Sequence, residues 1–303
     1  MRHDFNFGDI LTSSRRGAWE IEDVLPEGAE LDFSRHFMPE MLARTASIPF
    51  LSEEEARILN QIRGHEYLGL FGLVEEFILP FVLDHARPQL NGDDERVRAL
   101  LNFASEEAKH IHLFRQFEDL FTSSFGTPCA LIGPPEAIAK KVLGHDPLAV
   151  ALVILMIEWM TQSHYLDSVR DDGDLEPLFK SLLKHHWIEE AQHAKLDTLM
   201  VQALAEGRDQ AGILRAMDEF LEIGTFLDAG LANQAQFNLE AFEAATGRRL
   251  SGRERAGLIG QQHQALRWTY LGSGMIHPRF VETLTSISPA ARERISEVAP
   301  AFA

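Results

Sequence analysis

The pattern Glu-x-x-His occurs twice in this chain of 303 residues, and no other feature constrains its fold as strongly. One copy is Glu107 with His110, and the other, in the second half of the chain, is Glu190 with His193. On an α-helix, a glutamate and a histidine three positions apart project from the same face. A single such pair arises easily by chance in a helical protein. Two pairs indicate an internal repeat of helices.

The repeat extends to a second pair of glutamates. The offset that places Glu107 on Glu190 also places Glu75 on Glu158, so each of these glutamates precedes its Glu-x-x-His pattern by the same interval. Each half of the repeat is therefore predicted to contribute one helix with a glutamate and one helix with Glu-x-x-His. The repeat selects Glu75 over its neighbour Glu76, although a glutamate with no such context is expected to be solvated.

Hydrophobic periodicity and helix-start signals predict a chain made of helices. A capping box at residues 52–55, Ser-Glu-Glu-Glu, marks the first long helix. The predicted helices cover residues 53–86, 95–121, 148–160, 176–206, 209–245, 252–271 and 288–298, with a linker at 122–135. The predicted fold is all-α, a ferritin-like four-helix bundle over residues 51–206. An irregular N-terminal arm (1–50) and additional C-terminal helices (207–303) pack on it as parts of a single domain.

Such a bundle receives one glutamate from each of two helices and Glu-x-x-His from each of the other two, which is the ligand set of a carboxylate-bridged di-metal site. Four carboxylates in a bundle core would repel one another and lose their hydration, so the core needs compensating charge. Two divalent cations supply it. Oxygen and nitrogen donors suit iron or manganese better than zinc or copper(I). We therefore predict two iron ions, with manganese as the alternative.

His186 departs from the symmetry of the repeat. It precedes Glu190 by one helical turn and lies on the same helical face, but its counterpart in the first half is Phe103. From the residues alone, a histidine on the helix surface beside His185 is an equally good interpretation. As a ligand, His186 would give one metal ion a third nitrogen donor and make the two metal positions unequal.

Four segments together resemble the p-aminobenzoate N-oxygenase family of ferritin-like di-iron oxygenases: residues 74–78, 106–110, 157–158 and 186–193. The extra histidine one helical turn before the last metal-binding glutamate distinguishes that family. The resemblance covers residues 50–205. It implies seven iron ligands: Glu75, Glu107, His110, Glu158, His186, Glu190 and His193. It also implies activation of O2 and oxygen transfer to a small organic substrate, with N-oxygenation of an amine as one outcome and an external electron donor.

Other residues near these helices have open roles: Tyr67, Gln162, Tyr165 and Asp197. Tyr67 matches a tyrosine in the first helix of the family. Asp197 follows His193 by one helical turn, so it can accept a hydrogen bond from a ligand histidine or be a solvated carboxylate. Gln162 and Tyr165 either line a cavity or pack. Glycines 69 and 72 leave space for a substrate channel, or allow close helix packing.

Composition narrows the function classes. Lys and Arg number 28 against 46 Asp and Glu, and the formal charge of −18 argues against a nucleic-acid or anionic-membrane surface. The longest apolar run, residues 148–157, is shorter than the roughly 20 residues of a membrane span. Cys129 is the single cysteine, and the first residues lack the apolar core of a signal peptide. We expect a soluble, cytoplasmic protein that acts on a small molecule.

Two other functions are weighed against the oxygenase. A ferritin-like iron-binding or ferroxidase protein would share the ligand set, but such proteins are little more than the bundle itself. A helical interaction protein with vestigial Glu-x-x-His patterns is disfavoured because all seven ligand positions are filled. The sequence leaves open the substrate, the electron donor and whether the protein is a homodimer.

Overall fold

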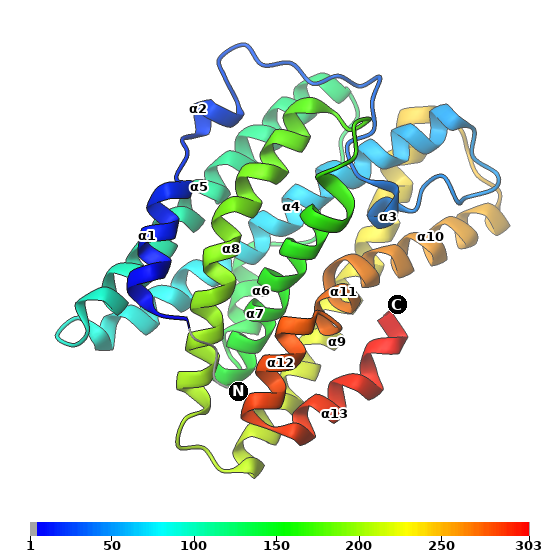
Figure 1. Ribbon diagram of the computed structural model, residues 1–303. Helices are drawn as coiled ribbons and strands as arrows, with labels where there is room; N and C mark the ends of the chain where they lie inside the picture. Colours follow the sequence, from blue (N-terminus) through cyan, green and yellow to red (C-terminus); the bar gives the residue numbers. More distant parts are fainter. Residues whose placement is uncertain (1–4, 303) are drawn as a thin grey trace.

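Four long helices form the centre of the protein, a computed structural model that describes residues 5–302. They are α4 (Glu53–Ala86), α5 (Asp94–Phe125), α7 (Pro147–His164) and α8 (Pro177–Ala205). Helix α4 lies along α5, α7 lies along α8, and α5 contacts α8 (Figure 1). Across residues 5–302 the backbone forms no β-strand, and an isolated bridge joins His36 to Leu175. The predicted all-α bundle is confirmed.

The helix starts follow local capping chemistry. At α4 the Ser52 hydroxyl accepts a hydrogen bond from the Glu55 amide at 3.2 Å, and the Glu55 carboxylate accepts one from the Ser52 amide at 2.8 Å. This is the capping box that the sequence predicts. Helix α8 begins one position later than predicted, because Glu176 is its N-cap and accepts from the Phe179 amide at 2.6 Å.

Helix α7 is the central helix of the bundle. Every residue from 148 to 162 is buried, which explains why this stretch is apolar on all faces. The helix and the π-helical turn that follows it, Tyr165–Val169, form a segment of 23 residues that is long and apolar enough to cross a membrane by length and composition. In this structure 94% of its apolar window is buried, as expected of a core helix.

The N-terminal arm is more regular than predicted. It contains α1 (Phe7–Gly17), α2 (Ile21–Val24) and α3 (Glu40–Ala43), and α1 packs against α5 and α8 (Figure 1). Glycine disfavours helix, yet Gly8 and Gly17 both lie within α1. Asn6 caps α1 by accepting from the Asp9 amide at 2.8 Å. A Cβ at Gly17 would lie 2.7 Å from the Ile188 side chain, so this glycine allows α1 to approach α8 closely.

The C-terminal region forms a layer of helices on the bundle. It comprises α9 (Gln210–Thr246), α10 (Gly252–Arg267), a π-helical turn (Trp268–Gly272), α11 (Ser273–Met275), α12 (Pro278–Ile287) and α13 (Pro289–Val298). Helix α9 contacts both α4 and α7. Outside the N-terminal arm, two helices of eight or more residues were not predicted: α12, and α6 (Pro135–Val142) in the first half. Each has a proline at its first position, where a proline favours a helix rather than breaking it.

Candidate metal centre

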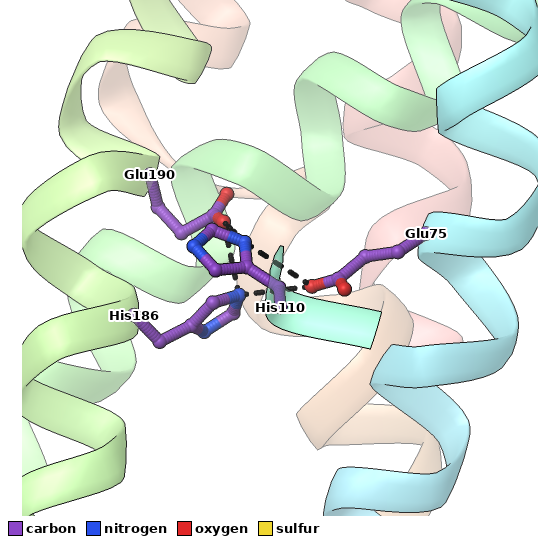
Figure 2. A group of neighbouring side chains, drawn as sticks. All are labelled: Glu75, His110, His186 and Glu190. Atoms are coloured by element: carbon purple, nitrogen blue, oxygen red, sulfur yellow. Dashed lines mark hydrogen bonds and ion pairs between the residues drawn. The ribbon is translucent and has the colours of Figure 1, made fainter. Parts of the chain in front are cut away.

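Six of the seven predicted ligands converge in the bundle core. They form two groups of four, in each of which the potential ligand atoms lie within 4.8 Å of one another: Glu75, His110, His186 and Glu190; and Glu107, His110, Glu190 and His193. All six side chains are buried. Figure 2 shows the first group, with Glu75 reaching from α4 toward the side chains of α8 and α5. His110 and Glu190 belong to both groups, so the two potential metal positions are adjacent.

Glu190 stands at the centre of the cluster. Its Oε1 atom lies 2.9 Å from His186 Nε2, 3.2 Å from His110 Nδ1 and 3.4 Å from His193 Nδ1. His186 Nε2 also lies 3.1 Å from Glu75 Oε1, and His193 Nδ1 lies 2.9 Å from Glu107 Oε1. A carboxylate shared by three imidazoles is placed where it can bridge two metal ions.

Glu158 lies beside this cluster but belongs to neither group of four. Its side chain, on α7, is 1% exposed. Burial raises its pKa well above the ordinary value, and the nearby Glu190 carboxylate raises it further. The carboxyl group therefore carries a cost in the core that a cation would relieve. Its place as a ligand stays a prediction.

Two further glutamates orient the imidazole rings of His110 and His193. The sequence analysis did not select them. Glu189 on α8 lies 2.7 Å from His110 Nε2 on α5, and Glu106 on α5 lies 2.9 Å from His193 Nε2 on α8. With a proton held on Nε2, each ring turns its Nδ1 lone pair toward the cluster. The sequence carried a signal for this pair, because the offset of the repeat also places Glu106 on Glu189.

The N-terminal arm supports both of these glutamates. The Lys109 ammonium group lies 2.6 Å from Glu189 and donates to the Trp19 carbonyl at 2.8 Å, while the Trp19 ring stacks on His110 with 5.8 Å between centroids. The hydroxyl of Ser14, on α1, donates to Glu106. The arm is therefore part of the structure that orients the site.

His186 differs from the other two histidines in its orientation and surroundings. It turns Nε2 rather than Nδ1 toward the cluster. The rings of Phe71 and Phe114 contact it edge-on, with centroids 5.4 and 5.1 Å away. Its counterpart in the repeat, Phe103, stacks on His193 at 4.0 Å. His186 is buried, so the alternative interpretation as a surface histidine is wrong.

The donor atoms fit two cations. Within residues 5–302, His193 Nδ1 and both oxygens of Glu107 are buried and have no hydrogen-bond partner of suitable geometry, although His193 and Glu107 approach to 2.9 Å. His110 Nδ1 and Glu75 Oε2 are in the same state. Donor atoms that share one metal ion, each about 2 Å from it, lie about 3 Å from one another. Buried donor atoms that face one another at this separation fit a metal ion placed between them.

Of the residues whose roles the sequence left open, Tyr67 and Tyr165 pack against other side chains, whereas the role of Gln162 has no structural explanation. The Tyr67 hydroxyl lies 3.1 Å from His164 Nδ1, and Tyr165 stacks on Trp187 at 4.5 Å. Gln162 is buried, and its amide nitrogen has no partner in the described part of the chain. A side chain on Gly69 would collide with Leu131 at 2.2 Å, so that glycine serves close packing.

Neither interpretation of Asp197 survives. Its side chain is fully buried rather than solvated, and the Nε2 atom of His193 is hydrogen-bonded to Glu106 instead. Among residues 5–302 neither oxygen of Asp197 has a hydrogen-bond partner. Burial raises its pKa well above the ordinary value, against the opposing charge of His193. Its position beside the cluster makes it a further carboxylate that cations would neutralise.

In the absence of metal ions, the histidines and carboxylates of the cluster share protons. Burial lowers the pKa of His193, but Glu190 and Glu106 outweigh it and the result lies well above the ordinary value. The pKa of His110 is raised in the same way by Glu189 and Glu190. Burial raises the pKa of Glu75 to about 8, and the Glu107 carboxylate adds to the rise.

Metal retention should therefore increase with pH. A metal ion binds the neutral imidazole and the ionised carboxylate, so binding must displace the protons of His110, His193 and Glu75. Because these pKa values are raised, affinity should fall as the pH drops through and below neutrality. Equilibrium dialysis of iron(II) without O2, from about pH 6 to pH 9, measures this dependence. An affinity that does not change over that range would contradict the buried proton-sharing cluster.

Comparison with known proteins finds one matching family model and similar solved structures. The family model described as p-aminobenzoate N-oxygenase AurF matches residues 15–226. Among solved structures, an R2-like ligand-binding oxidase mutant with an aerobically reconstituted Mn/Fe cofactor is 16% identical, with a TM-score of 0.48 over 94% of this chain and 92% of its own. Another mutant, with an Fe/Fe cofactor, is 16% identical with a TM-score of 0.45, covering 87% and 96%. A comparison with curated protein sequences found no significant match.

Proposed function

We propose that this protein uses two iron ions to activate O2 and oxygenate an amine. The chain belongs to the p-aminobenzoate N-oxygenase family. Membership of this family makes the protein an oxygenase and hence an oxidoreductase that acts on a small-molecule substrate. The observation that carries the proposal is the pair of buried four-residue groups that share His110 and Glu190. Their donors are carboxylates and imidazoles, which suit iron first and manganese second.

Seven residues would hold the two ions: Glu75, Glu107, His110, Glu158, His186, Glu190 and His193. When bound, the ions would supply the redox chemistry that reduces O2. Inserting one oxygen atom into a substrate while the other becomes water consumes two electrons and two protons, so an external electron donor is required. The protein contributes geometry and exclusion of water. Glu106 and Glu189 hold protons on the outer nitrogens of the imidazoles, and Phe71, Phe103 and Phe114 surround the histidines with carbon.

Replacing His186 tests the role of the third histidine, which has no histidine counterpart in the first half of the repeat. His186→Ala removes one of the four donors of the Glu75 group and none of the Glu107 group. We expect one iron ion to bind at least about 10–100-fold more weakly, which is the cost of losing only an outer partner of a ligand, and the other ion to be retained. His185→Ala is the matched control, because His185 turns its Nδ1 away to the Ser181 carbonyl at 2.8 Å. Iron titration of both variants measures the difference, and two unchanged ions in His186→Ala would remove this residue from the ligand set.

A ferroxidase is the second candidate, since it would share these ligands. Isotope labelling separates the two functions. Iron-loaded, chemically reduced protein is mixed with 4-methylaniline and oxygen-18 labelled O2, and the organic products are analysed by mass spectrometry. An N-oxygenase should yield a hydroxylamine or a more oxidised nitrogen product that carries the label. Consumption of O2 with label only in water or in ferric mineral would favour iron oxidation, and label on carbon would indicate hydroxylation instead.

A further inference from the structure

An apolar cavity lies beside the candidate metal centre, between α4, α7 and α9. Its volume is about 40 Å³, and its lining includes Leu70, Phe71, Val74, Ile157, Leu227 and Leu231. Val74 and Ile157 directly precede the predicted ligands Glu75 and Glu158 in the chain. Phe71 also contacts the His186 ring edge-on, with 5.4 Å between the centroids. The Phe71 ring is therefore a wall that the cavity shares with the metal centre.

The cavity presents carbon almost exclusively. Tyr270 is the one lining residue with a polar side chain, and its hydroxyl donates to Glu66 at 2.8 Å, so that group is already engaged. A water molecule needs about 10–15 Å³ and two to four polar partners. The space suffices for a water molecule, but the lining side chains offer no free partner. The cavity therefore favours an apolar guest.

The size of the cavity limits this guest to a very small molecule. Since one water molecule needs about 10–15 Å³, the volume of about 40 Å³ suits roughly two to three non-hydrogen atoms. An aromatic ring is too large, because an apolar cavity that binds benzene measures about 150 Å³. O2 has two atoms, no dipole moment and little capacity for hydrogen bonding. It matches the cavity in both size and polarity.

A wider hollow leads from the surface toward this cavity. It has a volume of about 620 Å³ and lies between α6 and α9, with exposed residues such as Lys141 and Ala229 at its outer part. The hollow and the cavity share three lining residues: Leu73, Ile132 and Leu227. These three side chains form the narrowing between an open outer space and a small inner one.

Ile132 is held at this narrowing by its backbone and by its side chain. Gln234 on α9 is fully buried, accepts a hydrogen bond from the Ile132 amide at 3.0 Å and donates to the Ala130 carbonyl at 3.0 Å. A Cβ on Gly230 would lie 3.1 Å from Ile132 Cδ1, so this glycine lets the isoleucine lie against α9. The narrowing is therefore a built feature of the fold.

We propose that O2 enters through this hollow and collects in the apolar cavity before it reacts at the metal centre. The inference rests on one part of the proposed function, the reaction of the reduced metal ions with O2, which an oxygenase and a ferroxidase share. O2 loses little by leaving water, and the cavity offers it a space that water does not fill. A larger organic substrate has no room in this cavity and does not compete for it.

O2 itself is the probe that tests the cavity, because it is paramagnetic and speeds the relaxation of nearby methyl groups. The full-length protein is loaded with zinc(II), which has no redox chemistry, and its Ile, Leu and Val methyl groups are followed by NMR under increasing O2 pressure. Relaxation at Val74, Ile157 and Leu231 should rise with pressure well above that at Ile154 and Leu182. These two controls are buried at least as deeply and line neither space. An equal rise at all five residues would overturn the inference.

Two substitutions on α9 with opposite effects on the available space test the route. Leu231→Phe fills part of the cavity, so the second-order rate constant for oxidation of the iron(II) protein by O2 should fall about tenfold or more. Leu227→Ala widens the narrowing and should raise this rate constant. Thr225→Phe is the control, because Thr225 is exposed on the same helix and lines neither space. Stopped-flow absorbance at several O2 concentrations measures the rates.

The iron content of all three variants should match that of the parent protein. An unchanged rate in Leu231→Phe would overturn the route. A slower reaction in both Leu231→Phe and Leu227→Ala would overturn it as well, because general disturbance of the fold would then explain the loss. If Leu231→Phe fails to fold, the relaxation of the parent protein still decides.

Failure of the proposed function is a distinguishable result. Enhanced relaxation at the cavity and slower oxidation of Leu231→Phe, in a protein that releases no labelled organic product, would retain the O2 cavity and refute the oxygenase.

Discussion

Glu190→Ala should release both metal ions, the largest single effect that the site predicts. Glu190 is one of two residues common to both groups of potential ligands, and its Oε1 atom lies within 3.4 Å of a nitrogen of all three histidines. Its loss would remove a donor that both groups share and one of the negative charges that would balance the cations. We expect each ion to bind more than about 100-fold more weakly, because replacing even an outer partner of a ligand costs 10–100-fold.

Glu76→Ala is the matched control for this variant. Glu76 is also a helical glutamate near the cluster, but it is paired with Arg115 at 2.7 Å and its side chain is 25% exposed. Metal analysis after dialysis should find the two ions retained in Glu76→Ala and lost in Glu190→Ala. Retention of both ions in Glu190→Ala would show that the metal centre lies elsewhere.

Glu66→Ala should cause the largest loss of stability outside the metal centre. The carboxylate of Glu66 is fully buried among Arg63 at 2.7 Å, Tyr270 at 2.8 Å and Asn238 at 3.1 Å. Removing it leaves the guanidinium of Arg63, whose side chain has no exposed surface, without its counter-ion. The expected cost is about 3–5 kcal/mol, out of the roughly 5–15 kcal/mol that stabilises a typical folded protein. Urea denaturation with an unchanged m-value measures it.

The double variant Arg63→Met with Glu66→Leu tests whether the stability lost in Glu66→Ala comes from the unpaired Arg63 charge or from lost packing. Burial raises the pKa of Glu66 even beside Arg63, which indicates that desolvation offsets much of the attraction within the pair. The double variant should therefore lose less stability than Glu66→Ala, because no charge is left unpaired. The part of the cost that remains comes from Tyr270 and Asn238, which lose their acceptor in both variants. If Glu66→Ala changes the free energy of unfolding by less than about 1 kcal/mol, the network is not important for stability.

The sequence could predict most of the metal cluster because an internal repeat carries it. Predicted ligands such as Glu75 and Glu190 each have a counterpart at a fixed offset in the other half of the chain, and helical spacing places residues on a shared face. The same repeat contained Glu106 and Glu189, but a glutamate that accepts a hydrogen bond from a histidine on another helix has no local pattern of its own. Its role depends on how α5 and α8 are placed against each other.

Long-range packing explains what the sequence could not predict. Gly17 is a residue type that usually interrupts helices. Only its proximity to Ile188 reveals that it allows α1 to approach α8 closely. Trp19 stacks on His110 from a distant part of the chain, and no periodicity links them. The small apolar cavity lined by Leu70, Leu227 and Tyr270 likewise draws its walls from helices far apart in the sequence.

Metal analysis of the purified protein tests the central claim most directly. Protein from cells grown with iron should contain close to two iron ions per chain, one for each group of buried ligands. Removing the ions with a chelator should lower Tm, because ions that bind the folded state stabilise it. A protein that contains no transition metal and whose Tm a chelator leaves unchanged would contradict the account.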